Sequence, residues 1–166
     1  MSPTCAFPLA EIADSVWVSS TPIRFAGTWF PHVMTAIRLT DGSVVLHSPC
    51  RPSPPLQAGL QSIGPVRHVV APNWFHDLYL GDYRRIYPQA TFWGPALLRR
   101  QKPRIIDYAL DEAARPPWYD EMPHFALTGL LTFDECVFLH SKTHTLIVAD
   151  VLMNLKSEPV TPPTRS

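Results

Sequence analysis

Residues 64–76 read GPVRHVVAPNWFH, and the predicted architecture depends mainly on this segment. The run from Val66 to Ala71 is rich in β-branched residues, which favours a buried strand that ends at Pro72. A helical pattern follows from Leu78 to Tyr87, and Pro88 closes it because proline cannot continue a helix. A strand, a loop and a helix in this order, followed by further alternation, indicate a layered α/β architecture.

Two β-rich runs precede this stretch and predict a hairpin. Met34 to Leu39 and Ser43 to His47 flank Asp41-Gly42, a dipeptide favoured in tight turns because glycine accepts a positive φ. A shorter β-rich run, Ser15 to Ser19, predicts an earlier strand. Three apolar residues share one helical face between Leu56 and Ile63, so we expect a short amphipathic helix there.

The second half of the chain continues the alternation of strands and helices. Ala90 to Trp93 predicts a strand, and Pro95 suits the start of a helix that runs through Arg100, because a missing N–H costs nothing there. Pro103 to Pro123 is irregular and predicts a surface excursion. Cys136 to His140 and Thr145 to Ala149 predict a second hairpin.

Composition limits the classes of function. A chain of 166 residues suits one domain, which we place at 1–155 before a disordered tail at 156–166. Lys+Arg and Asp+Glu are both 14, so we expect no nucleic-acid partner. We also expect no signal peptide and no membrane partner, because the apolar runs are too short. Three widely spaced cysteines suit a reducing compartment, which predicts a cytoplasmic protein.

Polar residues follow two of the expected strands. Asn73 and His76 lie in the loop after the Val66 to Ala71 strand, and Asp150 follows the Thr145 to Ala149 strand. Ligand sites in open α/β sheets gather at the carboxyl ends of strands, so we expect His76 and Asp150 to meet at one rim of a shared sheet. Imidazole and carboxylate are ordinary ligands of zinc, iron and manganese, which makes this pair a candidate metal site.

Each candidate residue also has a purely structural interpretation. His76 fits a histidine bonded to backbone near a helix start, and Asp150 fits a turn or capping aspartate. Asn73 suits an Asx turn, and Glu135 suits a polar residue at a strand edge. His140 lies beside the turn of the second hairpin, where an exposed histidine is ordinary. The aromatic residues near the loop suit either core packing or an apolar substrate pocket: Trp74, Phe75, Tyr79, Tyr83, Trp93 and Trp118.

Several short motifs together resemble a known family. They are Ser48-Pro49, Ala71-Pro72-Asn73 with His76, Tyr87-Pro88-Gln89-Ala90, Glu135-Cys136-Val137-Phe138-Leu139-His140 and Thr145-Leu146-Ile147-Val148-Ala149-Asp150. Their order, over roughly Glu11 to Asn154, resembles the N-terminal half of a metallo-β-lactamase-like domain, in an uncharacterised branch known as a domain of unknown function. The resemblance implies an α/β fold of the αββα-layered type, with a mixed sheet and flanking helices.

The sequence departs from the metal-binding pattern of that family. Active members carry His-x-His-x-Asp-His after the equivalent strand, and these ligands hold two metals that activate a water. Here His76 matches the last histidine, while Ala71, Asn73 and Phe75 occupy the other ligand positions. Asp150 matches the bridging aspartate. The resemblance therefore leaves His76 and Asp150 as the residual pair of a depleted metal site.

The function that the resemblance implies is a degenerate or atypical hydrolase of unknown substrate. Its mechanism would be attack of a water bound to zinc or iron on an ester, amide or phosphoester of a small molecule. His76 and Asp150 would be ligands and catalytic residues, with Asn73, Glu135 or His140 completing the shell; a chain without metal is the other option. The alternative function is a non-catalytic binding or assembly module. Sparse charge, 17% of residues, favours a homo-oligomer.

Overall fold

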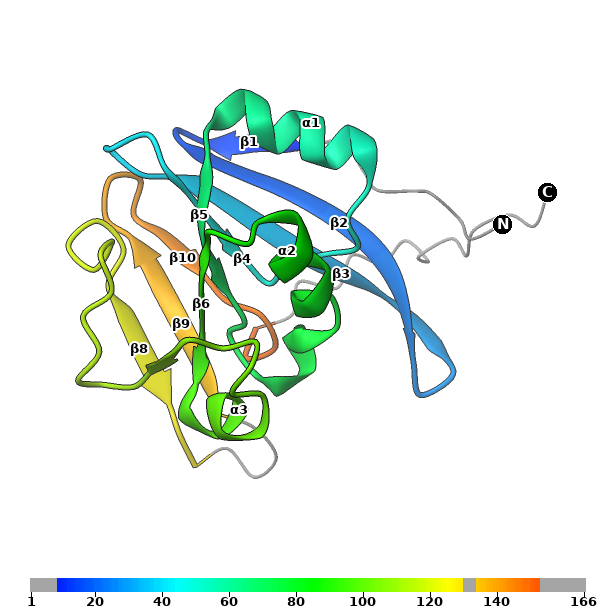
Figure 1. Ribbon diagram of the computed structural model, residues 1–166, viewed down its shortest axis with the longest axis vertical. Coiled ribbons are helices and arrows are strands. Elements are labelled where there is room, and N and C mark those ends of the chain that lie inside the picture. Colours follow the sequence, from blue (N-terminus) through cyan, green and yellow to red (C-terminus); the bar gives the residue numbers. More distant parts are fainter. Residues whose placement is uncertain (1–8, 130–133, 153–166) are drawn as a thin grey trace.

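The computed structural model describes residues 9–129 and 134–152, which form two β-sheets and a layer of helices (Figure 1). The large sheet contains seven strands, which lie side by side in the order in which they occur in the chain. They are β1 (Ala10–Ala13), β2 (Val16–Phe25), β3 (Thr28–Arg38), β4 (Val44–His47), β5 (Val66–Val70), β6 (Thr91–Pro95) and β7 (Tyr108–Leu110). Neighbours from β1 to β4 are antiparallel, and those from β4 to β7 are parallel.

A helix lies between each pair of parallel strands, as a parallel connection requires. These helices are α1 (Pro54–Ile63), α2 (Leu80–Ile86) and α3 (Ala96–Gln101), and a 3-10 helix, η1 (Trp74–Asp77), precedes α2. The small sheet is antiparallel, in the order β10, β9, β8. Its strands are β8 (His124–Leu127), β9 (Glu135–His140) and β10 (Thr145–Ile147).

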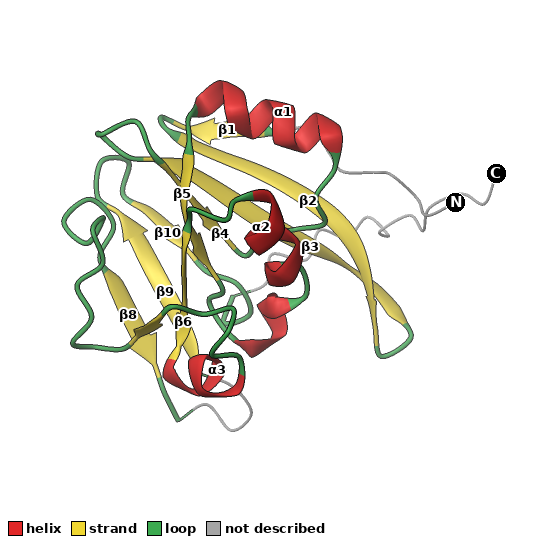
Figure 2. Ribbon diagram, viewed as in Figure 1, coloured by secondary structure: helices red, strands yellow, loops and turns green. Residues whose placement is uncertain are grey.

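The large sheet is covered by helices on one face and by the small sheet on the other (Figure 2). Alternate side chains of its strands enter two separate cores. Val69 of β5 packs with residues of α1, α2 and α3, such as Leu60. Its neighbour Val70 packs with Trp118 and with Phe138 of the small sheet. The described residues thus form helix, sheet and sheet layers, which confirms the predicted mixed-sheet α/β fold.

The predicted hairpin and the predicted amphipathic helix are confirmed. β3 and β4 pair around a turn in which Gly42 has a φ of +83°. Helix α1 begins after Ser53, whose side chain accepts a hydrogen bond from the Leu56 N–H at 3.4 Å. It ends at Gly64, whose N–H donates to the Leu60 carbonyl.

Some boundaries differ from the prediction. The Ser15 to Ser19 strand continues to Phe25, because β2 and β3 form a long two-stranded hairpin. The strand predicted to end at Ala149 ends at Ile147. The segment predicted to be irregular, Pro103 to Pro123, contains the three-residue strand β7, which pairs with β6. Strands β1 and β8 were also not predicted, and the expected tail lies outside the described residues. Among the described helices, none has the length and apolarity to cross a bilayer.

Candidate functional site

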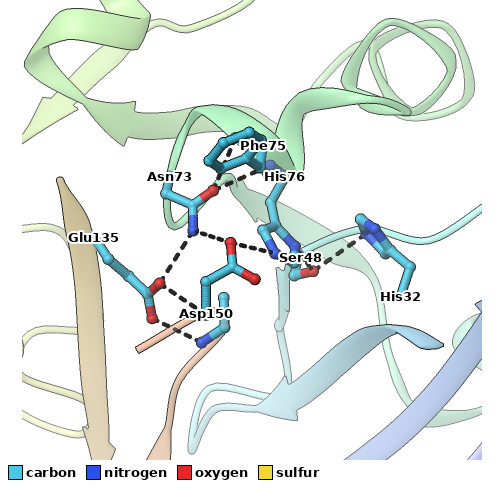
Figure 3. Close-up of polar contacts among 8 residues, drawn as sticks. His32, Ser48, Asn73, Phe75, His76, Glu135 and Asp150 are labelled. Atoms are coloured by element: carbon cyan, nitrogen blue, oxygen red, sulfur yellow. Dashed lines mark hydrogen bonds and ion pairs between the residues drawn. The ribbon is translucent and has the colours of Figure 1, made fainter. Parts of the chain in front are cut away.

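Asn73 organises the loop that leaves β5. Its side-chain oxygen accepts hydrogen bonds from the backbone N–H groups of Phe75, at 2.9 Å, and His76, at 3.2 Å. This is the capping pattern expected at a helix start, and it begins η1 directly after the strand. The cap turns the His76 side chain toward the rim of the large sheet (Figure 3). Asn73 is completely buried, so its side-chain N–H groups also need partners.

Those partners are two carboxylates from the small sheet. Asn73 Nδ2 lies 3.1 Å from Glu135 Oε2 and 2.9 Å from Asp150 Oδ2. Glu135 is completely buried at the start of β9 and accepts two further hydrogen bonds, from the backbone N–H groups of Ala149 and Asp150, both at 2.8 Å. Glu135 therefore holds the segment after β10 in place, and it orients Asp150 toward the loop after β5.

Asp150, after β10, and His76, in η1, contact each other directly. Asp150 Oδ2 lies 3.3 Å from His76 Nε2, and the two side chains are 29% and 12% exposed. Burial on its own raises the pKa of Asp150, but hydrogen bonds from His76 and Asn73 outweigh it, so the pKa lies below the usual value. The carboxylate is thus charged at neutral pH and faces the imidazole ring.

The other nitrogen of His76 contacts a residue that sequence reasoning did not propose for the site. His76 Nδ1 lies 2.6 Å from Ser48 Oγ, and Ser48 Oγ lies 3.3 Å from His32 Nε2 (Figure 3). Ser48 directly follows β4, and its backbone has a φ of +55°, which residues other than glycine rarely adopt. A chain of polar contacts therefore runs from His32 through Ser48 and His76 to Asp150.

His32 enters the site from β3. It is almost fully buried, and its ring centroid lies 4.8 Å from that of His76. Burial, and after it the nearby His76, lowers the pKa of His32 to about 4, so the His32 ring is neutral at pH 7. His47, the residue before Ser48, has its pKa lowered to about 3 by burial. Its Nε2 atom is buried and has no hydrogen-bond partner among the described residues.

Four of the five proposed site residues come together, and His140 does not. His76, Asp150, Asn73 and Glu135 form the contacts described above, whereas His140 lies at the opposite end of β9 from Glu135. His140 Nδ1 lies 2.7 Å from Thr143 Oγ1, and the ring lines a separate cavity of about 560 Å³. His140 is therefore not in a position to complete a metal shell with His76 and Asp150.

Ser48 and His32 belong to the site but were missed, for different reasons. Ser48 belonged to the Ser48-Pro49 motif, but nothing local indicated that its hydroxyl would meet His76. His32 lies in the middle of a strand that was predicted to begin only at Met34. The missing signal was the true length of β3, which pairs with β2 well before Met34 and therefore includes His32.

Exposed aromatic rings adjoin the site. The ring centroid of Phe75 lies 4.6 Å from that of Trp74 and 6.0 Å from that of Phe25, at the end of β2. All three are more than a third exposed. Of the aromatic residues that the sequence placed near the loop, Tyr83 and Trp118 are buried in the core, which confirms the core-packing interpretation for these two. The apolar surface at the site thus consists of Phe25, Trp74 and Phe75.

The donor atoms do not fit a catalytic zinc or iron site. Both oxygens of Glu135 accept N–H groups, and the oxygen of Asn73 accepts two backbone N–H groups. Of the five ligands proposed from the sequence, only His76 and Asp150 remain, whereas catalytic zinc uses three protein ligands. Within residues 9–129 and 134–152, no three His, Cys, Asp or Glu side chains form a group that could hold a metal ion.

Comparisons with known proteins agree with the fold. A family model described as Domain of unknown function (DUF4336) matches residues 13–163. The DIM-1 metallo-β-lactamase exposed to ceftazidime is similar in structure, with a TM-score of 0.65 and 12% identity over 81% of this chain and 65% of that one. The metallo-β-lactamase of Erythrobacter litoralis gives 0.59 and 17%, over 81% and 66%. That of Hirschia baltica gives 0.58 and 11%, over 84% and 70%.

At such low identities, these similarities show a shared fold and nothing finer. The chain spans about 65% of the length of the DIM-1 enzyme, slightly less than two thirds. No curated protein sequence matches it. The chain therefore shares the fold of the metallo-β-lactamases, and its chemistry depends on its own side chains.

Proposed function

Given that the chain belongs to the family described as Domain of unknown function (DUF4336), we propose that it is an atypical hydrolase on a metallo-β-lactamase-like scaffold. His76 and Asp150 are its catalytic pair, and its substrate is a small ester, amide or phosphoester. The observation that carries this proposal is the position of the His76 ring between a hydroxyl, at 2.6 Å, and a carboxylate, at 3.3 Å.

This arrangement suits acid–base chemistry. A carboxylate beside an imidazole orients the ring and stabilises it when it takes up a proton. Asp150 is suited to this role because its own hydrogen bonds keep it charged. Asn73 and Glu135 hold Asp150 in place, and they act as positioning residues rather than as ligands.

The exposed rings of Phe25, Trp74 and Phe75 support a substrate with an apolar portion. They lie beside His76 on η1 and at the end of β2, so an apolar group on them would place a neighbouring polar bond near the site. A small uncharged ester or amide fits this surface better than an anion does. The prediction of a small-molecule substrate in the cytoplasm belongs to the same proposal.

A hydrolysis assay tests the catalytic pair. Purified protein is incubated with nitrophenyl esters, an anilide and a nitrophenyl phosphodiester, with and without a chelator. We expect turnover of at least one substrate class, unaffected by the chelator. His76→Ala and Asp150→Asn should each lower it by about 100-fold or more, because general acid–base groups contribute at least this much. The exposed His144, in the β9–β10 turn, gives the matched control His144→Ala, which should retain the activity.

Elemental analysis provides the opposing result. Stoichiometric zinc, iron or manganese in the wild-type protein, lost in both His76→Ala and Asp150→Asn, would show that this pair binds a metal and would refute the metal-independent proposal. Inactivity toward all substrate classes would refute the hydrolase proposal as a whole.

A second candidate function is a non-catalytic assembly module, and one observation favours it. Phe125, Leu127 and Leu146 of the small sheet are each more than a third exposed. Apolar residues gathered on one sheet are typical of a surface that meets another protein. If this function holds, light scattering should detect a homo-oligomer that Leu146→Lys dissociates. A strictly monomeric species would count against it.

A further inference from the structure

Both nitrogens of the His76 ring already have partners, and this restricts what the ring can deprotonate. Nε2 faces Asp150 Oδ2 at 3.3 Å, and Nδ1 faces Ser48 Oγ at 2.6 Å. A ring nitrogen that faces a charged carboxylate acts as an N–H donor, which leaves Nδ1 as the acceptor. The proton that His76 is placed to remove is therefore that of the Ser48 hydroxyl, rather than that of a water.

We propose that Ser48 is a covalent nucleophile, activated by His76 and Asp150, and that the chain hydrolyses esters of short acyl groups through an acyl-serine intermediate. This inference rests on the proposed hydrolase function and adds the step by which hydrolysis proceeds. A nucleophile, a base within 2.6–3.2 Å of it and a third group that orients the base together mark activated serines on unrelated folds.

The backbone at Ser48 supports this role. Ser48 follows β4 directly, and its left-handed conformation, with a φ of +55°, turns the side chain toward His76 on the neighbouring loop. Strained backbone of this kind is concentrated at functional sites, where it fixes the direction of a reacting group. A tight strand-to-loop turn with the nucleophile at its apex is also how other hydrolases present a serine.

His32 holds the hydroxyl from the other side. Its Nε2 lies 3.3 Å from Ser48 Oγ, and its buried ring remains neutral at pH 7. Because it contacts Ser48 and not the reacting carbonyl, His32 is a positioning residue. It keeps the hydroxyl oxygen within reach of His76 while the proton moves.

Burial of Ser48 sets the size of the substrate. The residue is only 1% exposed, and the site opens to solvent mainly at Asp150. A bulky acyl group or a polypeptide would not reach Ser48 Oγ without displacing its neighbours. A short acyl group on a good leaving group is the substrate that requires the least displacement of these neighbours.

The reaction balances with the groups present. Ser48 Oγ forms a bond to the acyl carbon while its proton passes to His76 Nδ1. The bond from the acyl carbon to the leaving oxygen breaks, and His76 returns the proton to that oxygen, which releases an alcohol. Water then attacks the acyl carbon and gives a proton to His76. The bond to Ser48 Oγ breaks, the acid leaves, and the proton returns to Ser48.

Trapping of the acyl group tests the inference. The full chain is mixed with excess p-nitrophenyl acetate, and nitrophenol release is followed while intact mass and peptide mass are measured. We expect an initial burst of about one nitrophenol per chain and a single acetyl group on Ser48. Ser48→Ala and Ser48→Gly should both lose the burst and the acetyl group. Glycine suits the positive φ, so Ser48→Gly should remain folded, as circular dichroism would verify.

An exposed serine outside the site provides the control. Ser62 lies on α1, where its hydroxyl donates to the Gly59 carbonyl, and Ser62→Ala should keep the full burst. Acetylation of His76, Ser62 or lysines alone would overturn the inference. If folded Ser48→Gly still turns the ester over, the inference fails and the hydrolase proposal stands. If neither burst nor turnover occurs with any substrate class, both fail.

Discussion

Asn73 connects three parts of the chain through one side chain. Its oxygen caps η1, and its N–H groups bind Glu135 of β9 and Asp150 after β10. An amide is suited to this position because it accepts on one side and donates on the other. An aspartate, which only accepts, would face two further carboxylates in a buried space. Asn73 occupies a position that holds a metal ligand in active members of the family, but here it positions the loop that carries His76.

Glu135 is the residue on which this support depends most. It is fully buried, and its two oxygens accept from the backbone N–H groups of Ala149 and Asp150 and from Asn73. Glu135→Gln places an NH₂ group where an acceptor is needed, so a buried donor loses its partner. We expect a loss of about 2 kcal/mol in the free energy of unfolding, measured by urea denaturation.

The matched control for this prediction is the exposed Glu112, in the loop after β7. Glu112→Gln should change the free energy of unfolding by less than about 0.5 kcal/mol, because surface substitutions away from buried networks have small effects. Equal stability of Glu135→Gln and the wild-type protein would contradict the role given to Glu135.

Strand ends explain why part of the site could be predicted. His76 and Asp150 were predicted to meet at one rim of a shared sheet, because each follows a strand. The two side chains do meet, but β5 belongs to the large sheet and β10 to the small one, so the shared sheet was wrong. The packing of the two sheets brings these strand ends together. Ser48 also follows a strand, but its contact with His76 depends on a backbone conformation that serine does not favour. His140 was assigned to the same site, but it lies at the end of β9, whereas Glu135 lies at its start. Two residues that are close in a sequence motif can therefore lie at opposite ends of one strand.

At the scale of elements, the segments with local signals were predictable and those without them were not. The hairpin of β3 and β4 and helix α1 carry a turn dipeptide, a cap and an apolar face, which are local signals. Strand β7 has three residues, and β8 has four. Such short strands are stabilised by pairing with β6 and β9, which are distant interactions that a local pattern does not contain.

The close approach of α1 to the hairpin turn gives a prediction at this scale. Gly64 ends α1 with a φ of +152°, and a Cβ atom there would lie 2.3 Å from the Gly42 carbonyl oxygen. Gly64→Ala must therefore move one backbone segment away from another. We expect a loss of about 2 kcal/mol or more in the free energy of unfolding, measured by urea denaturation.

Gly81 is the matched control, because it lies inside α2 and a Cβ atom there would meet nothing within 4 Å. Gly81→Ala should raise the free energy of unfolding by about 0.5–1 kcal/mol, since alanine favours the helix. A Gly64→Ala variant as stable as the wild-type protein would mean that α1 does not pack against the turn as closely as described.

At the scale of the whole molecule, cover on both faces of the large sheet removes polar side chains on its central strands from water. Three neighbouring strands each carry one histidine that is shielded from water: His32 on β3 and His47 on β4 are buried, and His68 on β5 is half-buried. Burial is the main cause in each case, and it lowers their pKa values from 6.5 to about 4, about 3 and about 4. The fold therefore disfavours the charged form of all three.

This burial makes stability depend on pH in a defined direction. Between pH 6.5 and 4, the unfolded chain binds protons at His32, His47 and His68 that the folded chain does not, so the free energy of unfolding falls as the pH drops. Each unit of pKa shift is worth about 1.4 kcal/mol. Urea denaturation at pH 7.5 and at pH 4.5 measures this loss of stability. Between these two pH values, His32→Gln should lose about 2 kcal/mol less of its free energy of unfolding than the wild-type protein does. The control is the exposed His144, and His144→Asn should lose as much as the wild type. Equal losses in His32→Gln and wild type would show that His32 is not kept neutral by the fold.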